Sequence, residues 1–197
     1  MDTARYVVGC LLVVGLPPGL GYWFVIHPFV DRWRRFGVRR TFWLVGVLSL
    51  LSAYGLFRVR DRLLMEDLGT STVLIVIGVL LAVAAAAIGV ARRRHLTFHR
   101  LSGAPELDPS GKGGELLTDG LYAVTRNPRY IEVVAGAFAY ACFSNYVGAY
   151  LVAFAALPLL HLIVRLEERE LRDRFGEPYE AYLARVPRYL PRRRPAP

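Results

Sequence analysis

The sequence predicts an all-α integral membrane protein with five transmembrane helices, the last two of which form a C-terminal helical hairpin. Two observations lead to this fold class. The 197 residues are 54% hydrophobic and have a mean hydropathy of +0.34, which is high for a protein that must stay dissolved. The apolar residues also lie in long runs, with arginines between them. The length fits one domain over residues 1–197, with three helices in residues 1–91 and a ligand-binding region in residues 92–197.

The first three apolar runs each predict one spanning helix. Residues 4–26 contain Pro17 and Pro18 but lack a basic leader and a small-residue cleavage site, so we expect a retained, kinked helix and not a signal peptide. Residues 41–57 form a second run that is short for a span. Residues 70–91 form the third run, whose 22 residues carry no charge and would extend about 33 Å as a helix.

The fourth apolar run, residues 130–164, is too long for a single crossing. Ser144, Asn145 and Tyr146, followed by Gly148, lie near its middle. These residue types favour a turn. We therefore predict two helices joined by a tight turn, which brings the number of spans to five.

The arginines predict how the chain is oriented in the membrane. Those that follow the first and third runs are Arg32, Arg34, Arg35, Arg39, Arg40, Arg92, Arg93 and Arg94. The N-terminus carries only Arg5, the turn of the hairpin carries none, and the segment after the second run carries both signs of charge. Because basic segments stay on the cytoplasmic side, we expect the N-terminus outside and the C-terminus in the cytoplasm.

The net charge of +9 could suggest nucleic acid as a partner, but arginines beside apolar runs favour contact with anionic membrane lipids. Lys112 is the single lysine among 25 basic residues, a bias that suggests a GC-rich genome and a bacterial cytoplasmic membrane. The chain is therefore predicted to have membrane lipids, and no nucleic acid, as partners.

Two polar segments, residues 92–129 and 167–197, are expected at the cytoplasmic surface on either side of the hairpin. The first contains a glycine-rich stretch, residues 111–122, and then Pro128 at the start of a predicted helix. One interpretation is a solvated loop before a helix that begins with proline. The other is a backbone that wraps a ligand and presents it to the free N–H groups of that helix.

Glu167, Glu168 and Glu170 lie at the C-terminal end of the last predicted span. Charges are common where a span meets water, so a solvated helix end is one interpretation. Acids at this end are nevertheless unfavourable with the helix dipole, and a cationic ligand group would relieve that repulsion. We expect Glu167 to face such a ligand and Glu170 to face water.

The polar segments contain an ordered set of motifs. They are Gly120-Leu121-Tyr122, Arg126-Asn127-Pro128-Arg129-Tyr130, Glu167-Glu168, Phe175-Gly176-Glu177-Pro178-Tyr179-Glu180-Ala181-Tyr182 and Val186-Pro187-Arg188, followed by Pro191. In this order and spacing, the chain resembles the isoprenylcysteine carboxyl methyltransferases and their bacterial relatives, a family related to the phospholipid methyltransferases. The resemblance covers residues 115–191, and the first three helices match only in being helices.

The resemblance implies a methyltransferase that uses S-adenosyl-L-methionine and a lipophilic small-molecule or lipidated substrate. It implies a cofactor site lined by Gly114, Glu115, Leu116, Leu117, Tyr122, Asn127, Pro128, Arg129, Tyr130 and Glu167. In such a site a carboxylate would bind the ammonium group, an aromatic ring the sulfonium or adenine, and loop amides the carboxylate. The residues expected near the reacting group are Arg126, Asn127 and Arg165.

Two departures from the family pattern concern catalysis and the acceptor. Asn127 stands where the family has a histidine, so this position has no titratable ring. Ile163 stands where the family places an arginine that binds the acceptor's carboxylate, and Arg165 lies about 200° away around the helix. We therefore expect an acceptor other than a prenylcysteine carboxylate. His161, inside the last span, is a further candidate because intramembrane histidines are commonly functional.

Two other functions remain open. An NADPH-dependent membrane reductase of the steroid-reductase type has a similar C-terminal architecture, but the acidic end of the last span disfavours a cofactor with a 2′-phosphate. A non-catalytic membrane scaffold would keep the fold, which the departures at Asn127 and Ile163 allow. No metal is expected, because His95 and His99 lie among arginines without a carboxylate partner.

Overall fold

The computed structural model describes residues 1–93, 107 and 114–190, and this part of the chain is mostly helical. In chain order its helices are α1 (Asp2–Ile26), η1 (His27–Phe29), α2 (Val30–Phe36), α3 (Val38–Arg58), α4 (Arg60–Leu64), α5 (Thr72–Arg93), η2 (Gly120–Ala123), α7 (Pro128–Ser144), α8 (Val147–Phe175) and α9 (Glu177–Arg185). β-Pairing in these residues is limited to an isolated bridge between Asp67 and Tyr146. The predicted all-α fold is confirmed for the described residues.

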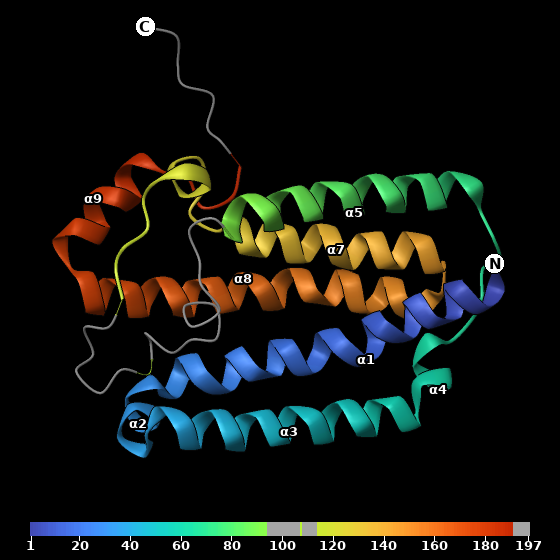
Figure 1. Cartoon of the computed structure of the whole chain (residues 1–197), viewed down its shortest axis with the longest axis horizontal. Coiled ribbons are helices and arrows are strands. Elements are labelled where there is room, and N and C mark those ends of the chain that lie inside the picture. Colours follow the sequence, from blue (N-terminus) through green and yellow to red (C-terminus); the bar gives the residue numbers. More distant parts are fainter. Residues whose placement is uncertain (94–106, 108–113, 191–197) are drawn as a thin grey trace, which may run out of the picture.

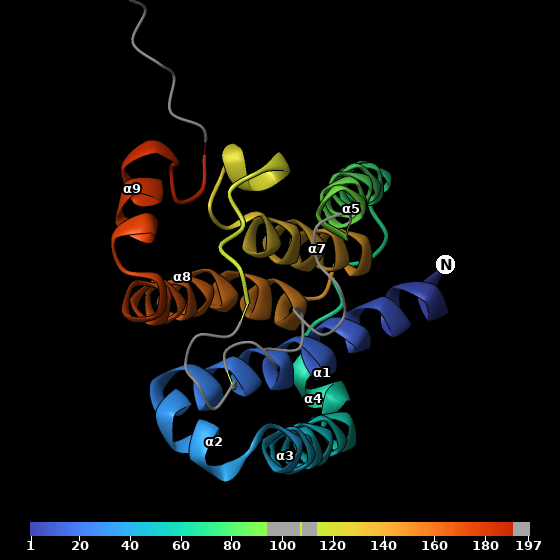
Figure 2. The same ribbon diagram turned by 60° about the vertical axis from the view of Figure 1, so that its left-hand side comes forward.

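The long helices lie side by side in a bundle (Figure 1). α1 runs obliquely through it and contacts α3 on one side and α7 and α8 on the other. α5 packs along α7, so that α7 is surrounded by α1, α5 and α8. Figure 2 shows α9 and the segment that contains η2 at one end of the bundle, beside the ends of α7 and α8.

Among the described residues, four helical segments are long and apolar enough to cross a membrane: Asp2–Phe36, Val38–Arg58, Thr72–Arg93 and Val147–Phe175. They correspond to the first, second, third and fifth predicted spans. α7, expected as the fourth, has 17 residues, fewer than the roughly 20 of a typical span. The chain is thus a membrane protein with four such helices, and a fifth span stays a prediction.

Small residues let α7 pack closely against its neighbours. A Cβ atom added to Gly78 of α5 would lie 2.9 Å from the backbone oxygen of Ala139 in α7. Ala137 and Ala141, also in α7, are buried in a cluster with Leu12 of α1. Since helix packing inside a membrane depends on close van der Waals contact, these residues favour an inner position for α7.

Polar contacts tie together three chain segments at one end of the bundle. Asn145, which follows α7, adopts a left-handed conformation with φ 56° and ψ 46°. Its Nδ2 donates a hydrogen bond to the carbonyl of Gly69 at 2.9 Å. Arg5 is 1% exposed, donates to the carbonyl of Ser144 at 3.0 Å and forms an ion pair with Asp67. The N-terminal turn of α1, the segment before α5 and the α7–α8 connection therefore share this end.

The opposite end of the bundle, the polar end, carries η1, α2, η2, α9 and the C-terminal turns of α5 and α8 (Figure 1). A hydrophobic cluster of Leu20, Tyr130, Leu160 and Ile163 joins α1, α7 and α8 near this end. Both polar segments predicted from the sequence therefore meet above one apolar cluster, and the candidate site lies there.

Candidate cofactor-binding site

A pocket lies at the polar end between the segment before α7, the first turn of α7, the last turns of α8, and α9. Its empty space is about 890 Å³, including the part that is open to solvent. The residues that line it are Gly114, Glu115, Leu116, Leu117, Tyr122, Arg126, Asn127, Pro128, Arg129, Tyr130, Glu167, Leu171, Arg174, Phe175, Tyr179 and Tyr182.

The pocket brings together every residue that the sequence predicted as cofactor-binding, from residues 114–117 through Tyr122 and residues 127–130 to Glu167. Of the residues predicted near the reacting group, Arg126 and Asn127 also line it. Arg165 does not line it and lies exposed on α8. Folding thus places residues more than fifty positions apart in the chain around one space.

Five lining residues were not predicted: Leu171, Arg174, Phe175, Tyr179 and Tyr182. Tyr179 and Tyr182 belong to a motif recognised in the sequence but not assigned to the pocket. Leu171 and Arg174 follow Glu167 by four and seven positions, which places them on the same face of α8. The helical spacing from Glu167 could therefore have identified Leu171 and Arg174 from the sequence.

Glu167 and Tyr130 form one wall of the pocket. Tyr130, in the first turn of α7, donates a hydrogen bond from its hydroxyl to Oε2 of Glu167. Tyr130 is 6% exposed and packs against Leu160 and Ile163, so its ring is held in place by the apolar cluster. The arrangement presents an oriented carboxylate, the group that a cationic ligand needs.

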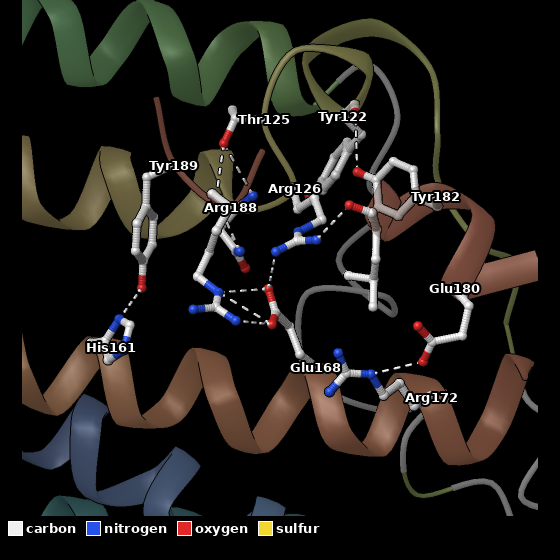
Figure 3. Close-up of polar contacts among 12 residues, drawn as sticks. Tyr122, Thr125, Arg126, His161, Glu168, Arg172, Glu180, Tyr182, Arg188 and Tyr189 are labelled. Atoms are coloured by element: carbon white, nitrogen blue, oxygen red, sulfur yellow. Dashed lines mark hydrogen bonds and ion pairs between the residues drawn. The ribbon is translucent and has the colours of Figure 1, made fainter. Parts of the chain in front are cut away.

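Glu168 is the next residue of α8, but it is 2% exposed and does not line the pocket. It binds Arg126, which lines the pocket, and Arg188, which does not (Figure 3). Arg188 donates to it from Nη2 at 2.7 Å and from Nε at 3.0 Å. Nη2 of Arg126 lies 3.1 Å from its Oε1. Because removal of Glu168 would leave the largely buried charge of Arg126 without this carboxylate, its loss should cost about 3–5 kcal/mol. Glu168 therefore anchors the segments on either side of the pocket to α8.

The same two segments are also joined by hydrogen bonds to the backbone. Thr125 Oγ1 and Asn127 Nδ2 each donate to the carbonyl of Arg188 at 3.1 Å. The hydroxyl of Tyr182 donates to the carbonyl of Tyr122 at 2.7 Å (Figure 3). Asn127 is 7% exposed, so its side-chain amide holds the C-terminal segment against the start of α7. This contact explains how an uncharged residue at this position supports the pocket.

Three tyrosines of the pocket remain neutral phenols at ordinary pH. Burial, together with the nearby charge of Glu167, raises the pKa of Tyr122 to about 12. Burial is also the main cause that raises the pKa of Tyr179 and that of Tyr182 above the ordinary phenol value. These side chains can therefore donate hydrogen bonds and offer aromatic faces, but they are not bases.

Glu170 does not face water, and that prediction was wrong. Its side chain is buried, 2.8 Å from the guanidinium of Arg34 and 3.6 Å from that of Arg174. Arg34 belongs to α2, a short helix beside the end of α8. The sequence alone does not show this contact, because Arg34 reaches Glu170 from a distant part of the chain.

His161 lies within α8 and pairs with Tyr189, its Nδ1 being 2.9 Å from the tyrosine hydroxyl (Figure 3). Both residues line an apolar groove between α7 and α8, together with Leu157 and Tyr130. Tyr130 also lines the larger pocket, so the groove and the pocket share one wall. His95, His99 and residues 111–113 lie outside the described residues.

The apolar helices are typical of a membrane protein, and the pocket at one end of their bundle is a candidate ligand site. A model of the family Phospholipid methyltransferase matches residues 70–178, from the start of α5 to the start of α9. The chain belongs to this family, and the activity that the family indicates is methyl transfer at a membrane. No curated protein and no solved structure was found to match the chain.

The family match coincides with the region that carries the site. It includes the pocket residues from Gly114 to Phe175 and ends one residue before Tyr179. The phospholipid methyltransferases are the family to which the isoprenylcysteine carboxyl methyltransferases, identified by the sequence motifs, are related. The narrower likeness to isoprenylcysteine carboxyl methyltransferases stays a resemblance.

Proposed function

We propose that this protein transfers the methyl group of S-adenosylmethionine to a lipophilic acceptor that resides in the membrane. The observation that carries the proposal is the convergence of all residues predicted for the cofactor in one pocket, at the end of a bundle of apolar helices. Membership of the phospholipid methyltransferase family supports the same reaction class. The site residues proposed for the cofactor are those predicted from the sequence.

The chemistry of the pocket fits this cofactor. Glu167 offers a carboxylate for the ammonium group, and Tyr122 and Tyr179 offer aromatic faces for the adenine and the sulfonium. The backbone of residues 114–117 offers N–H donors for the cofactor's carboxylate. When bound, S-adenosylmethionine would supply an electrophilic methyl group on sulfur.

The protein's part in the reaction is to align the acceptor with the methyl–sulfur bond and to exclude water. Arg188 donates hydrogen bonds to Glu168 and accepts others at its carbonyl from Thr125 and Asn127, and these bonds hold the C-terminal segment beside the pocket. Nε of Arg126, a pocket-lining residue, has no hydrogen-bond partner among the described residues. This N–H is the donor with which Arg126 would orient the reacting group.

The apolar groove between α7 and α8 is the proposed path of the acceptor. Its walls are almost entirely hydrocarbon, apart from His161 and Tyr189. Leu157 is 40% exposed on the outer surface of the bundle, so the groove is open to the lipid phase. Because Tyr130 separates the groove from the cofactor pocket, a lipid chain in the groove would bring its polar end toward Glu167.

Cofactor binding separates this proposal from its two rivals. Purified protein is titrated with S-adenosylmethionine and, separately, with NADPH, and the change in intrinsic fluorescence is measured. The proposal predicts saturable binding of S-adenosylmethionine only. Binding of NADPH alone would support the reductase, and binding of neither would support the scaffold.

The acceptor is then found by reaction. A membrane lipid extract is incubated with the protein and cofactor labelled in its methyl group. Label should appear in the lipid fraction and should be lost with the Glu167→Gln variant. If label enters only water-soluble products, the acceptor part of the proposal is wrong while the cofactor part stands.

A further inference from the structure

A second, polar pocket lies beside the candidate cofactor site, between η1, α2 and the last turns of α8. Its empty space is about 760 Å³, including the part open to solvent. The groups that matter for its chemistry are His27, Arg34, Arg169 and Arg174. Arg174 also lines the cofactor site, so its side chain separates the two spaces.

Two side chains of this pocket are deeply buried and lack hydrogen bonds. His27 is 5% exposed, and neither of its ring nitrogens has a hydrogen-bond partner among the described residues. The side chain of Arg174 is also 5% exposed, and its Nε and Nη1 lack partners in the same part of the chain. Buried donors are nearly always satisfied in native proteins, so these groups indicate a ligand that accepts hydrogen bonds.

The other contacts of these two residues leave their donors available. His27 stacks on Trp23 with ring centroids 5.1 Å apart, which orients the ring without using its nitrogens. Arg174 lies over the ring of Phe175 and approaches Glu170 at 3.6 Å through Nη2, not through Nε or Nη1. An imidazole has an N–H donor in either neutral tautomer, so His27 and Arg174 together offer at least three N–H groups.

The charged side chains that line this pocket balance one another. Of its carboxylates, Asp31 and Glu170 are both bound to Arg34, at 2.9 Å and 2.8 Å. Asp173 lies exposed at the rim. The guanidinium groups of Arg34, Arg169 and Arg174 thus balance these three carboxylates, and what favours an anion is the set of N–H groups on His27 and Arg174 that lack partners among the described residues.

We propose that this pocket is a phosphate-binding site built from His27, Arg169 and Arg174. A phosphate group accepts several hydrogen bonds at once and matches guanidinium donors that converge from different directions. The pocket lies at the end of two candidate spans, Asp2–Phe36 and Val147–Phe175, the depth at which lipid phosphates lie if these segments cross the bilayer. The phosphate can belong to a lipid headgroup or be free in solution. Binding here does not depend on the proposed methyl transfer.

The test is ligand-induced stabilisation of the full chain in a neutral detergent. The probes are inorganic phosphate, the short-chain lipid dihexanoyl phosphatidic acid, and dihexanoylglycerol as the lipid without phosphate. Thermal unfolding midpoints are measured against probe concentration, with no cofactor present. At least one phosphate probe should raise the midpoint in a saturable way, and dihexanoylglycerol should not.

Three variants give the result its specificity. His27→Phe keeps the ring on Trp23 but removes the nitrogens, and Arg169→Gln removes a guanidinium that lines the pocket. Each should weaken the apparent phosphate affinity about tenfold. The matched control is Arg165→Gln, an exposed arginine one turn earlier on α8 that does not line the pocket; its affinity should stay within about twofold of native. Without ligand, His27→Phe should be no less stable than the native protein, because it removes an unsatisfied buried group.

The outcomes are distinct. A response to phosphatidic acid alone assigns the site to a lipid headgroup, and a response to inorganic phosphate alone assigns it to the free ion. A response to both probes shows that the pocket recognises the phosphate group itself, whether it is free or part of a lipid. The proposal is overturned if neither phosphate probe raises the unfolding midpoint. It is also overturned if Arg165→Gln and His27→Phe lose the same amount of apparent phosphate affinity. S-adenosylmethionine binding can fail without changing these results, so the two proposals are tested separately.

Discussion

Glu167 and Glu168 are neighbours in the chain but serve different parts of the molecule. Successive residues of a helix point about 100° apart. Glu167 consequently faces the pocket and accepts a hydrogen bond from Tyr130, while Glu168 turns toward Arg126 and Arg188 and is buried there. One carboxylate is thus left for a ligand, and the other is used to hold the site together.

The first prediction concerns Glu167. Glu167→Gln keeps the shape of the side chain and removes its charge, so it should weaken S-adenosylmethionine binding by about 1.5–3 kcal/mol if the carboxylate binds the ammonium group. Calorimetric titration measures this change directly.

Glu177→Gln is the control for this experiment. Glu177 is exposed at the start of α9 and does not line the pocket, whereas Glu170 is unsuitable because it is buried against Arg34. The affinity of Glu177→Gln should match the native value. Equal and small effects at Glu167 and Glu177 would show that Glu167 does not bind the cofactor.

The second prediction concerns the acceptor. Ile163 is completely buried in the cluster with Leu20 and Tyr130. No guanidinium is therefore available at the position where the isoprenylcysteine carboxyl methyltransferases, which the sequence resembles, are expected to bind an acceptor carboxylate. Without it, a carboxylate loses a contact worth about 2–5 kcal/mol. We therefore expect weak or no methylation of a prenylcysteine analogue, compared with lipid amines or hydroxyls.

This acceptor prediction is best measured with the native protein in a side-by-side assay with labelled cofactor. Ile163→Arg is a poor test, because it would force a charge into the apolar cluster and destabilise the fold. Turnover of the prenylcysteine analogue that equals or exceeds that of the lipid acceptors would contradict the prediction.

At the scale of elements, glycine positions decide how closely the helices approach. Gly148 lies in the first turn of α8, directly against α4. A Cβ atom added there would lie 1.7 Å from the carbonyl oxygen of Leu63 and 2.8 Å from its carbonyl carbon. Both are backbone atoms, so a rotamer change cannot relieve the clash. The connection between α7 and α8 therefore depends on glycine at this position.

The third prediction follows from this contact. Gly148→Ala should destabilise the protein by about 3 kcal/mol or more, because α4 or α8 must move. Gly136→Ala, in α7, is the matched control, since a Cβ atom there meets nothing within 4 Å. It should be neutral or stabilising by up to about 1 kcal/mol. Thermal unfolding in detergent measures both, and equal midpoints for the two variants would contradict the close contact.

At the scale of the whole molecule, the bundle has two chemically different ends. One end gathers the N-terminus, the segment before α5 and the α7–α8 connection, where Arg5 is neutralised by Asp67. The other gathers the pocket, the second polar pocket and the arginines of α2 and of the last turn of α5. Each end therefore has to lie on one side of the membrane as a unit.

The fourth prediction is the orientation of these ends. Because the excess of arginine marks the cytoplasmic side, a reporter enzyme fused after the last residue should be active only in the cytoplasm. A fusion that ends at Asn145 should be active only outside. Activity of both reporters on the same side would mean that α8 does not cross the membrane. The opposite pattern would place both pockets outside.

Local sequence patterns were sufficient to predict most of the long helices and most of the residues that line the larger pocket. Long apolar runs predict spanning helices because the bilayer requires them, and four were recovered. The second and third agree with their observed bounds within three residues, whereas the first and the last helical segments extend about ten residues beyond the predicted apolar runs. The motifs around Tyr122, residues 127–130 and Glu167 predicted residues that line one pocket, the one proposed to bind the cofactor, because each motif lies at a helix end that faces the same space. Periodicity along α8 would also have supplied Leu171 and Arg174.

Other features depend on contacts that no local pattern contains. Glu170 is buried because Arg34, 136 positions away in the chain, packs against it from α2. The separate roles of Glu167 and Glu168 depend on where Arg188 returns after α9. His27 and Arg174 form one polar pocket only because η1 lies against the end of α8. Burial and pairing of charges are properties of the packed chain, so tertiary structure decided them.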